Sequence, residues 1–324
     1  MSLPPVLHHA RLALRFNGLW WREFAYLGSV YGPEWWKRYS PPFIGAIIFA
    51  MIGANRRGAI ANMQRVLNAD RPTAALAALR MFAEFAYCMS ETMEYYSPHP
   101  RPVRLDFTGR DLVADALREG RGVIAVTGHF GNWDISAKIF RDSDRPINLV
   151  MARDPNATTQ DFVRKAREEA GVRVIFSDTS VFSSLNMIRA LRQNEIVAIQ
   201  LDRMLGPGGA RQLPFLGAPA AFPSGPFVLA RLAGAPVFPV FVPRLGRRHY
   251  ALHMGTRVDV PREARDPQVL DRVMMEAVRQ FEDIVRRYPL QWFQFAPFWR
   301  EGAAPDSGIA DHEDPAEPKV GQRV

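Results

Sequence analysis

The chain has 324 residues, of which 48% are hydrophobic and 23% charged, so it can bury a substantial core and is not an intrinsically disordered protein. A single cysteine, Cys88, excludes an intrachain disulfide and a cysteine-based zinc site. The net charge is +8, and because residues 301–324 hold six acidic against two basic residues, residues 1–300 carry about +12. Such a basic body suits an anionic membrane, an acidic carrier protein, the phosphates of coenzyme A or nucleic acid. Nucleic acid fits least, since the arginines are scattered and no zinc finger or aromatic ribonucleoprotein motif is found.

The first part of the chain, residues 1–57, is rich in tryptophan and basic residues, and Phe43–Ala54 then runs for twelve residues without a charge. Aromatic and basic side chains favour the headgroup layer of a membrane. Twelve apolar residues are fewer than the roughly 20 that a spanning helix needs. We therefore expect residues 1–57 to form an amphipathic helical anchor lying in the membrane interface; the alternative is that they cap the core as buried helices. No signal-peptide pattern is found at the start.

Residues 58–97 have apolar side chains at spacings of three and four, which predicts helix, and Pro98 ends the pattern. Strand and helix then alternate, which predicts an α/β fold with a mostly parallel sheet flanked by helices. A further helix is expected from Asp266 to Arg287, within a catalytic domain of residues 58–300, and residues 301–324 are expected to be a disordered acidic tail. The predicted strands are 122–127, 147–151, 172–176, 196–201 and 237–242, and the predicted helices between them are 133–140, 158–170, 183–193 and 225–233.

The segment Gly128–Asp134 lies between a predicted buried strand and a predicted helix, and it contains a histidine and an aspartate five residues apart. On one continuous helix this spacing would splay the two side chains by roughly 140°. A strand, a turn and a new helix, with Asn132 as its N-cap, would let Asp134 in the first turn reach back to the ring of His129. That geometry suits a general base and the group that orients it. The alternative is a loop histidine beside a helix-start acid, with no chemistry.

Other polar residues also follow predicted strands. Arg153 follows the second strand and Asp202 with Arg203 the fourth, so these side chains and His129 are expected at the carboxyl edge of the sheet, where open α/β folds place their sites. Each also has a structural explanation, because Arg153 could pair with Asp154 at the surface and Asp202 could cap a turn.

The His-x4-Asp pattern resembles that of glycerolipid-type acyltransferases, and several later segments extend the likeness in order. Together they resemble the bacterial lipid A late acyltransferases, which transfer lauroyl and myristoyl chains, and their mycobacterial relatives that acylate phosphatidylinositol mannosides. The likeness covers roughly residues 10 to 300. The segments are Met151–Asn156, Ile196–Arg203, Pro214–Gly217, Phe222–Pro226 and Gly234–Val240.

The resemblance implies direct transfer of a fatty acyl chain from an acyl thioester, on acyl carrier protein or coenzyme A, to a hydroxyl of a glycolipid or lipid A-type acceptor. It implies action at the cytoplasmic face of the inner membrane and no cofactor or metal. His129 would act as base and Asp134 would orient it, while backbone N–H groups at the Asn132 helix start, or an arginine, would hold the tetrahedral oxyanion. The chain lacks Gly-x-Ser-x-Gly, as direct transfer requires no nucleophilic serine. The expected substrate-binding residues are Gly131, Asn132, Arg153, Asp202, Arg203, Phe215 and Gly217.

Two other functions fit the residues. One is a non-catalytic membrane-surface lipid-binding protein of the same fold. The other is a metal-dependent hydrolase using His129, Asp134 and Asp202 as ligands, although the remaining histidines make no ligand spacing with them. Among acceptors, a lipid A precursor, a phosphatidylinositol mannoside, another glycolipid and a secondary-metabolite hydroxyl all remain open.

Overall fold

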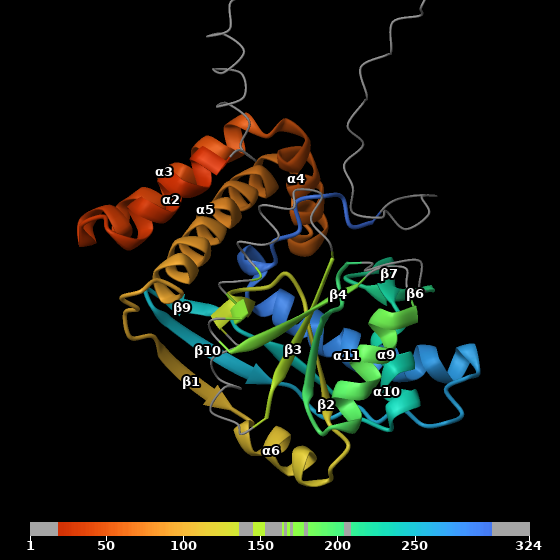
Figure 1. Ribbon diagram of the computed structural model, residues 1–324. Coiled ribbons are helices and arrows are strands. Elements are labelled where there is room, and N and C mark those ends of the chain that lie inside the picture. The colour runs from red at the N-terminus through yellow and green to blue at the C-terminus, as the bar shows by residue number, and fades with distance from the viewer. Residues whose placement is uncertain are drawn as a thin grey trace, which may run out of the picture.

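A computed structural model describes residues 19–135, 145–152, 164, 167–168, 171–177, 181–203 and 209–299 (Figure 1). Its centre is an eight-stranded sheet in the order β1-β10-β8-β2-β5-β3-β4, with β9 paired to β10. All pairs from β8 to β4 are parallel, as is β1 with β10, and only β10 runs antiparallel to β8 and β9. The predicted largely parallel α/β sheet is confirmed. The strands are β1 (Arg104–Thr108), β2 (Val123–Thr127), β3 (Ile147–Ala152), β4 (Val172–Ser177), β5 (Ile196–Gln200), β8 (Val237–Phe241), β9 (Arg244–Gly246) and β10 (His249–Met254).

All five predicted strands are present, and the sequence reading missed five others. β1, β9 and β10 extend one side of the sheet, and β6 (Ala210–Phe215) and β7 (Ala218–Pro223) form a separate antiparallel hairpin. The hairpin turn has left-handed backbone at Leu216 and Gly217, with φ of 50° and 80°.

The predicted helical stretch 58–97 is two helices, because Asn68 takes a left-handed conformation and Asp70 caps the next helix through the Thr73 amide at 3.1 Å. The helix predicted from Asp266 is confirmed, with that residue as its N-cap. The helices predicted at 133–140 and 158–170 lie mostly outside the described residues, as does the predicted acidic tail. The described α-helices are α2 (Leu19–Val30), α3 (Glu34–Met51), α4 (Gly53–Leu67), α5 (Arg71–Tyr95), α6 (Arg110–Arg118), α9 (Val181–Arg192), α10 (Gly225–Ala233) and α11 (Pro267–Arg287). The short 3₁₀ helix η1 (Pro289–Gln291) follows α11.

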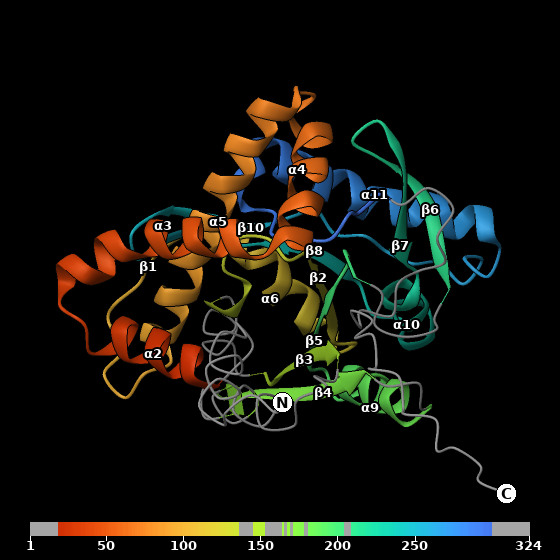
Figure 2. The same cartoon turned by 90° about the horizontal axis from the view of Figure 1, so that it is seen from above.

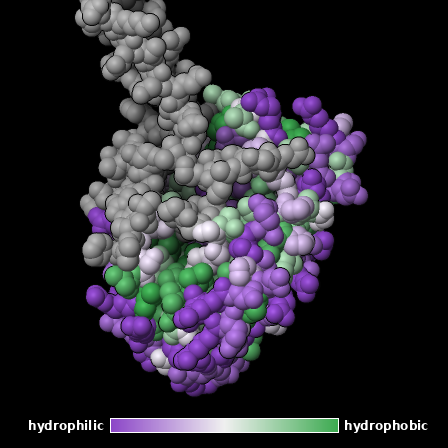
Figure 3. All heavy atoms as spheres, turned by 90° about the vertical axis from the view of Figure 1, so that its right-hand side faces the viewer, coloured by the Kyte–Doolittle hydropathy of each residue, from purple (hydrophilic) through white to green (hydrophobic). Residues whose placement is uncertain are grey.

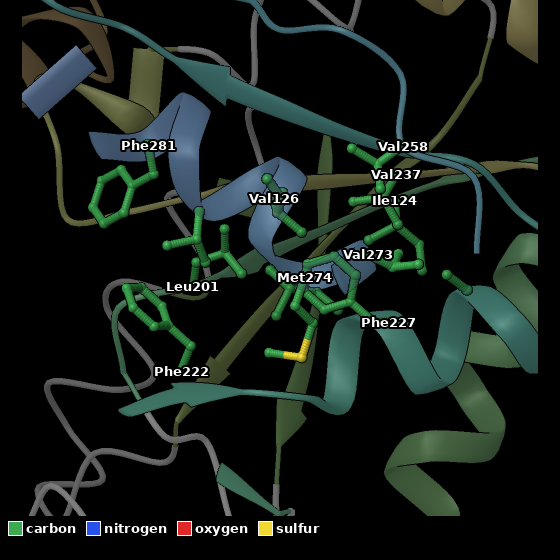
Figure 4. Close-up of a cluster of buried hydrophobic side chains, with 14 of the residues drawn as sticks. Ile124, Val126, Leu201, Phe222, Phe227, Val237, Val258, Val273, Met274 and Phe281 are labelled. Carbon is green, nitrogen blue, oxygen red and sulfur yellow. The ribbon is translucent and has the colours of Figure 1, made fainter. Parts of the chain in front are cut away.

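The central strands are buried on both faces, as expected for a parallel sheet covered by helices. Alternate residues of β2 enter two different cores: Ile124 and Val126 pack with α10 and α11, whereas Val123 and Ala125 pack with α6. Figure 4 shows part of the first core, with side chains from β2, α10 and α11 in contact. Because β2 is buried from both sides, its position is fixed, and so is the point at which the loop after Thr127 begins.

Helices α2 to α5 form a separate layer that lies away from α9 and α10 in both views (Figures 1 and 2). Gly45 lets α3 cross closely over α5, since a Cβ there would lie 2.7 Å from the Phe82 carbonyl oxygen. Of the described helices, none alone is long and apolar enough to cross a membrane; α3 and α4 reach that threshold only together, and they are bent by 104°. The predicted membrane attachment of residues 1–57 therefore stays a prediction.

Candidate active site

His129 lies in the loop that follows β2, and hydrogen bonds to the segment after α11 hold this loop in place. Its backbone oxygen accepts from the Phe293 amide at 2.7 Å, and the Gly131 amide donates to the Gln291 oxygen at 2.8 Å. Glycine is required on both sides of the loop. At Gly131, where φ is 57°, a Cβ would lie 2.0 Å from the Val242 oxygen, and at Gly128 it would lie 2.7 Å from the ring of Phe281.

The ring of His129 is held by Asp202. Nδ1 lies 2.8 Å from Oδ1 of Asp202, and the backbone N–H of His129 donates to Oδ2 at 2.7 Å. The indole N–H of Trp292 donates to the same Oδ2 at 3.0 Å. The Asp202 side chain is completely buried, while 12% of the His129 side chain is exposed.

The register of the sheet explains this pairing. β2 and β5 are parallel neighbours in which Thr127 is opposite Gln200, so His129 and Asp202 both lie two residues beyond a paired position. The two side chains therefore arrive side by side at the carboxyl edge of the sheet, as the alternation of strands and helices predicts.

The charge state of Asp202 follows from its contacts. Burial opposes ionisation, but the adjacent His129 and its two hydrogen bonds outweigh burial and hold the pKa of Asp202 below its ordinary value. An ionised carboxylate only accepts hydrogen bonds, so Nδ1 of His129 carries the proton. Nε2 is then left as the basic nitrogen, which is the tautomer that a general base needs.

The prediction that Asp134 orients His129 is wrong. Its carboxylate pairs with Arg167 instead, with Oδ1 at 3.0 Å from Nε and 2.5 Å from Nη2, and 12% of each side chain is exposed. The first turn of the helix directs Asp134 to this arginine, while Asp202 arrives from the adjacent strand and occupies the space at Nδ1. A ligand set of His129, Asp134 and Asp202 is therefore not assembled, and among the described residues no group of three or more potential metal-binding His, Cys, Asp or Glu side chains occurs.

A small pocket lies beside this site. Thr127 and Trp133 line it, and the Trp133 ring packs edge-on against His129 with centroids 5.3 Å apart. Asp134 and Arg167 supply charge to its wall, and small side chains on two neighbouring strands leave room over the sheet. The apolar wall is formed by Ala125, Ile147, Leu149, Val172, Ala198 and Val240.

The structure places several other predicted site residues away from this pocket wall. Phe215 is fully buried among Phe281, Trp292 and Trp299, and Gly217 lies in the β6–β7 turn. Arg203 is exposed next to Asp202, whose pKa its charge helps to lower. Arg153 lies outside the described residues.

The side chain of Asn132 is buried and makes hydrogen bonds within the protein. Its Oδ1 accepts from Thr92 at 2.9 Å, so its side chain does not cap the helix as predicted. Its backbone N–H donates to the Val242 oxygen at 2.8 Å, and that of Gly131 is also engaged. These two amides are therefore not available as oxyanion donors, whereas Arg167 lines the pocket and is a candidate for the predicted arginine.

Sequence reasoning missed Trp292 and Arg167. Trp292 is the largest fully buried side chain and lies 90 residues from the carboxylate it contacts. Arg167 falls in the helix predicted at 158–170, and nothing in the sequence distinguishes it from the other arginine there. A buried indole N–H is usually hydrogen-bonded. A tryptophan such as Trp292 therefore indicates that a polar partner exists, but the sequence does not show which residue it is.

A histidine that a buried carboxylate orients at the carboxyl edge of a parallel sheet is an arrangement that suits a general base in an α/β enzyme. Comparison with known families makes the class specific. Residues 9–301 match the bacterial lipid A biosynthesis acyltransferase family, and the chain belongs to it. It is an acyltransferase.

One relative supports the same assignment. A phosphatidylinositol mannoside acyltransferase of Mycolicibacterium smegmatis is 26% identical over 222 residues, which cover 67% of this chain and 67% of that protein. Both comparisons agree with the resemblance seen in the sequence.

Proposed function

We propose that this enzyme transfers a fatty acyl chain from an acyl thioester to a hydroxyl group of a glycolipid. The observation that carries the proposal is the His129–Asp202 pair, whose histidine ring packs against Trp133, a residue that lines the apolar pocket. The family and the mycobacterial relative favour a glycolipid acceptor, either lipid A-type or a phosphatidylinositol mannoside. The donor is a thioester of acyl carrier protein or coenzyme A.

In the proposed reaction, Nε2 of His129 removes the proton of the acceptor hydroxyl while its oxygen attacks the thioester carbonyl. The carbon–sulfur bond then breaks as the tetrahedral intermediate collapses, and the imidazolium returns its proton to the leaving thiolate. Asp202 stabilises the imidazolium and fixes the ring. The products are an ester and a free thiol, so atoms and charge balance without a cofactor.

We propose that the acyl chain lies along the apolar wall of the pocket, because burying a chain against apolar side chains contributes about 0.8 kcal/mol for each CH₂. Arg167 lines the pocket and pairs with Asp134 there, so in this scheme its positive charge stabilises the negative charge that develops on the carbonyl oxygen. In this scheme Asp134 serves the reaction through Arg167 and not through His129.

A direct assay tests the function. The purified enzyme is incubated with one acyl donor and one acceptor at a time. The donors are an acyl-coenzyme A and an acylated carrier protein, and the acceptors are a lipid A precursor and a phosphatidylinositol mannoside. The products of each combination are identified by mass spectrometry. We expect one donor and acceptor combination to give an acylated glycolipid, and lipids from cells with and without the gene to differ in the same species. Binding of these lipids with no turnover would contradict the proposal.

We also propose that the enzyme works at the cytoplasmic face of an anionic membrane, on the surface that α2 and α3 expose. Large apolar side chains recur there every three or four residues, and each is 51–70% exposed. Exposed apolar side chains that recur in this way are typical of a surface that contacts a membrane or another protein. Together with the basic body, this favours a helix pair lying flat in the headgroup layer. The residues are Phe24, Leu27, Tyr31, Trp35, Tyr39, Phe43, Ile47 and Met51.

The opposite side of the molecule provides the comparison. Figure 3 shows that the described residues on that side are mainly hydrophilic, with hydrophobic side chains gathered in one region. Leu185 on α9 and Leu232 on α10 are 52% and 51% exposed, close to the values in the stripe. They are therefore matched controls for the loss of an exposed apolar side chain.

We expect the double variant Phe43→Glu/Ile47→Glu to partition at least about tenfold more weakly onto vesicles containing anionic lipid, since each apolar side chain removed from water contributes roughly 1.5–3 kcal/mol. The variant Leu185→Glu/Leu232→Glu adds the same charge and should bind like the wild type. Cosedimentation with vesicles at low and high salt measures both, and wild-type binding should weaken with salt. Equal binding by the two double variants would show that the membrane contact lies elsewhere.

Direct transfer predicts that no acyl group resides on the protein. Cys88 is buried and its pKa is raised well above its ordinary value by burial, which disfavours the nucleophilic thiolate. Ser224 donates its hydroxyl to the Gly209 oxygen at 2.6 Å. Intact-protein mass spectrometry after mixing with donor alone should show no adduct, and Cys88→Ala and Ser224→Ala should keep activity. A stoichiometric adduct that disappears when acceptor is added would refute direct transfer.

A further inference from the structure

A buried chain of polar groups connects the His129 loop to α5 and β10. Asn132, three residues after His129, is 3% exposed and donates from Nδ2 to the hydroxyl of Tyr250 at 3.1 Å and to the Cys88 oxygen at 3.1 Å. The hydroxyl of Tyr250, a residue with no exposed surface, donates in turn to Oε2 of Glu91. Burial and the neighbouring Cys88 and Glu91 raise the pKa of Tyr250 well above its ordinary value, so its proton stays on the hydroxyl.

The far end of this chain is a buried ion pair. Glu91 accepts from Arg244 at 3.0 Å and 3.2 Å, and their side chains are 8% and 9% exposed. The backbone of Arg244 exchanges hydrogen bonds with the side chain of Gln291 at 2.7 Å and 2.8 Å, and the backbone oxygen of Gln291 accepts the Gly131 amide. Two routes therefore lead from Arg244 to the residues just after His129.

A buried network of this kind is costly unless every member is satisfied. Here the members are satisfied and their donors run in one direction, from Asn132 to Tyr250 to Glu91. Asp202 orients the ring of His129, but nothing in that pair fixes the backbone beyond Phe130. A base misplaced by about 1 Å can lose on the order of 100-fold in rate.

We propose that Glu91, Tyr250 and Asn132 are positioning residues that hold the loop after β2 and so keep Nε2 of His129 in reach of the acceptor hydroxyl. The proposal rests on the proposed role of His129 as base. It differs from a purely structural role, because it predicts a loss of turnover in protein that is still folded.

The test is Tyr250→Phe, which keeps the ring and removes only the hydroxyl that joins Asn132 to Glu91. The matched control is Asn148→Leu at the start of β3, on the opposite edge of the sheet from His129. Asn148 is 4% exposed and makes two hydrogen bonds, to Glu195 at 2.8 Å and to the Ile196 oxygen at 3.3 Å. Both changes leave buried polar partners unsatisfied, so both lower stability.

Two measurements are made on each variant at a temperature where its folded fraction is confirmed by circular dichroism. For Tyr250→Phe we expect kcat to fall about tenfold with KM within twofold, and hydrogen exchange to accelerate in peptides covering residues 128–135. For Asn148→Leu we expect wild-type kcat and wild-type exchange in those peptides. The pH profile of Tyr250→Phe should keep its limbs, because the His129–Asp202 pair is intact.

Hydrogen exchange does not depend on any assay substrate, so failure of the two proposals can be told apart. If the wild type transfers no acyl group, the proposed function fails, and unchanged exchange at 128–135 in Tyr250→Phe would separately overturn positioning of the loop. Faster exchange with unchanged kcat would overturn the claim that the positioning serves the reaction. A loss of kcat in Asn148→Leu equal to that in Tyr250→Phe would assign both effects to stability.

Discussion

Replacing His129 by alanine should abolish acyl transfer while leaving the fold in place. A positioned general base contributes about 10²- to 10⁴-fold to the rate, and no other side chain of the described site offers a basic nitrogen that a carboxylate orients in this way. Asp202 would keep two of its three donors, the His129 backbone N–H and the Trp292 indole. We therefore expect a loss of stability of no more than about 1–3 kcal/mol, measured by denaturant unfolding, beside a loss of kcat of at least about 100-fold.

A second histidine–carboxylate pair gives the control. His249 on β10 lies with its Nε2 2.7 Å from Oδ2 of Asp106 on β1, a contact as short as that between His129 and Asp202. His249→Ala removes this pair from the edge of the sheet, so transfer should continue at nearly the wild-type rate. Near-normal turnover by His129→Ala would leave the mechanism without a base and would refute it.

The sequence predicts the middle of the fold better than its edges. β2, β3, β4, β5 and β8 are short apolar runs that a sheet buried on both faces requires, and all were identified. β1 is mostly exposed and carries charged residues, so it has no such run. The β6–β7 hairpin contains Pro214 and Pro219, which argue against strands in a sheet interior but are tolerated in a two-stranded ribbon.

The meeting of His129 and Asp202 at one edge of the sheet could be predicted from the sequence, but their pairing could not. Strand endings place His129 and Asp202 at one edge of the sheet, but the order of strands decides which endings are neighbours. The sequence does not reveal that β5, and not β3, lies beside β2. Five residues of separation suggested Asp134 as the partner of His129, whereas parallel register brings in Asp202 from 73 residues away. Contacts of this range follow from topology, on which local spacing carries no information.

The second large effect is expected for Asp202→Asn. The carboxylate accepts three hydrogen bonds, two at Oδ2 and one at Oδ1. In an asparagine the amide oxygen can accept the two donors at the Oδ2 position, which turns its NH₂ group toward Nδ1 of His129. Nδ1 must then accept, so the proton moves to Nε2 and the base is lost. A wrong tautomer of this kind costs on the order of 10⁴-fold in kcat.

The stability of the same variant should also respond differently to acid. Because the pKa of Asp202 is lowered in the folded protein, its ionised form contributes stability that is fully present above the unfolded pKa of about 3.9 and is lost as the pH falls toward the folded value. Asparagine does not titrate. The free energy of unfolding of Asp202→Asn should therefore depend less steeply on pH below about pH 4 than that of the wild type.

Asp134→Asn is the comparison that separates the two carboxylates. It weakens the contact with Arg167 and leaves the tautomer of His129 unchanged, so we expect a loss of about tenfold, the scale of a lost charge contact of roughly 1.4 kcal/mol. Steady-state kinetics of both variants under one set of conditions decides the assignment. If Asp134→Asn lost more activity than Asp202→Asn, then Asp134 would be the group that supports the base during turnover, and the ring orientation seen in this structure would not be the reactive one.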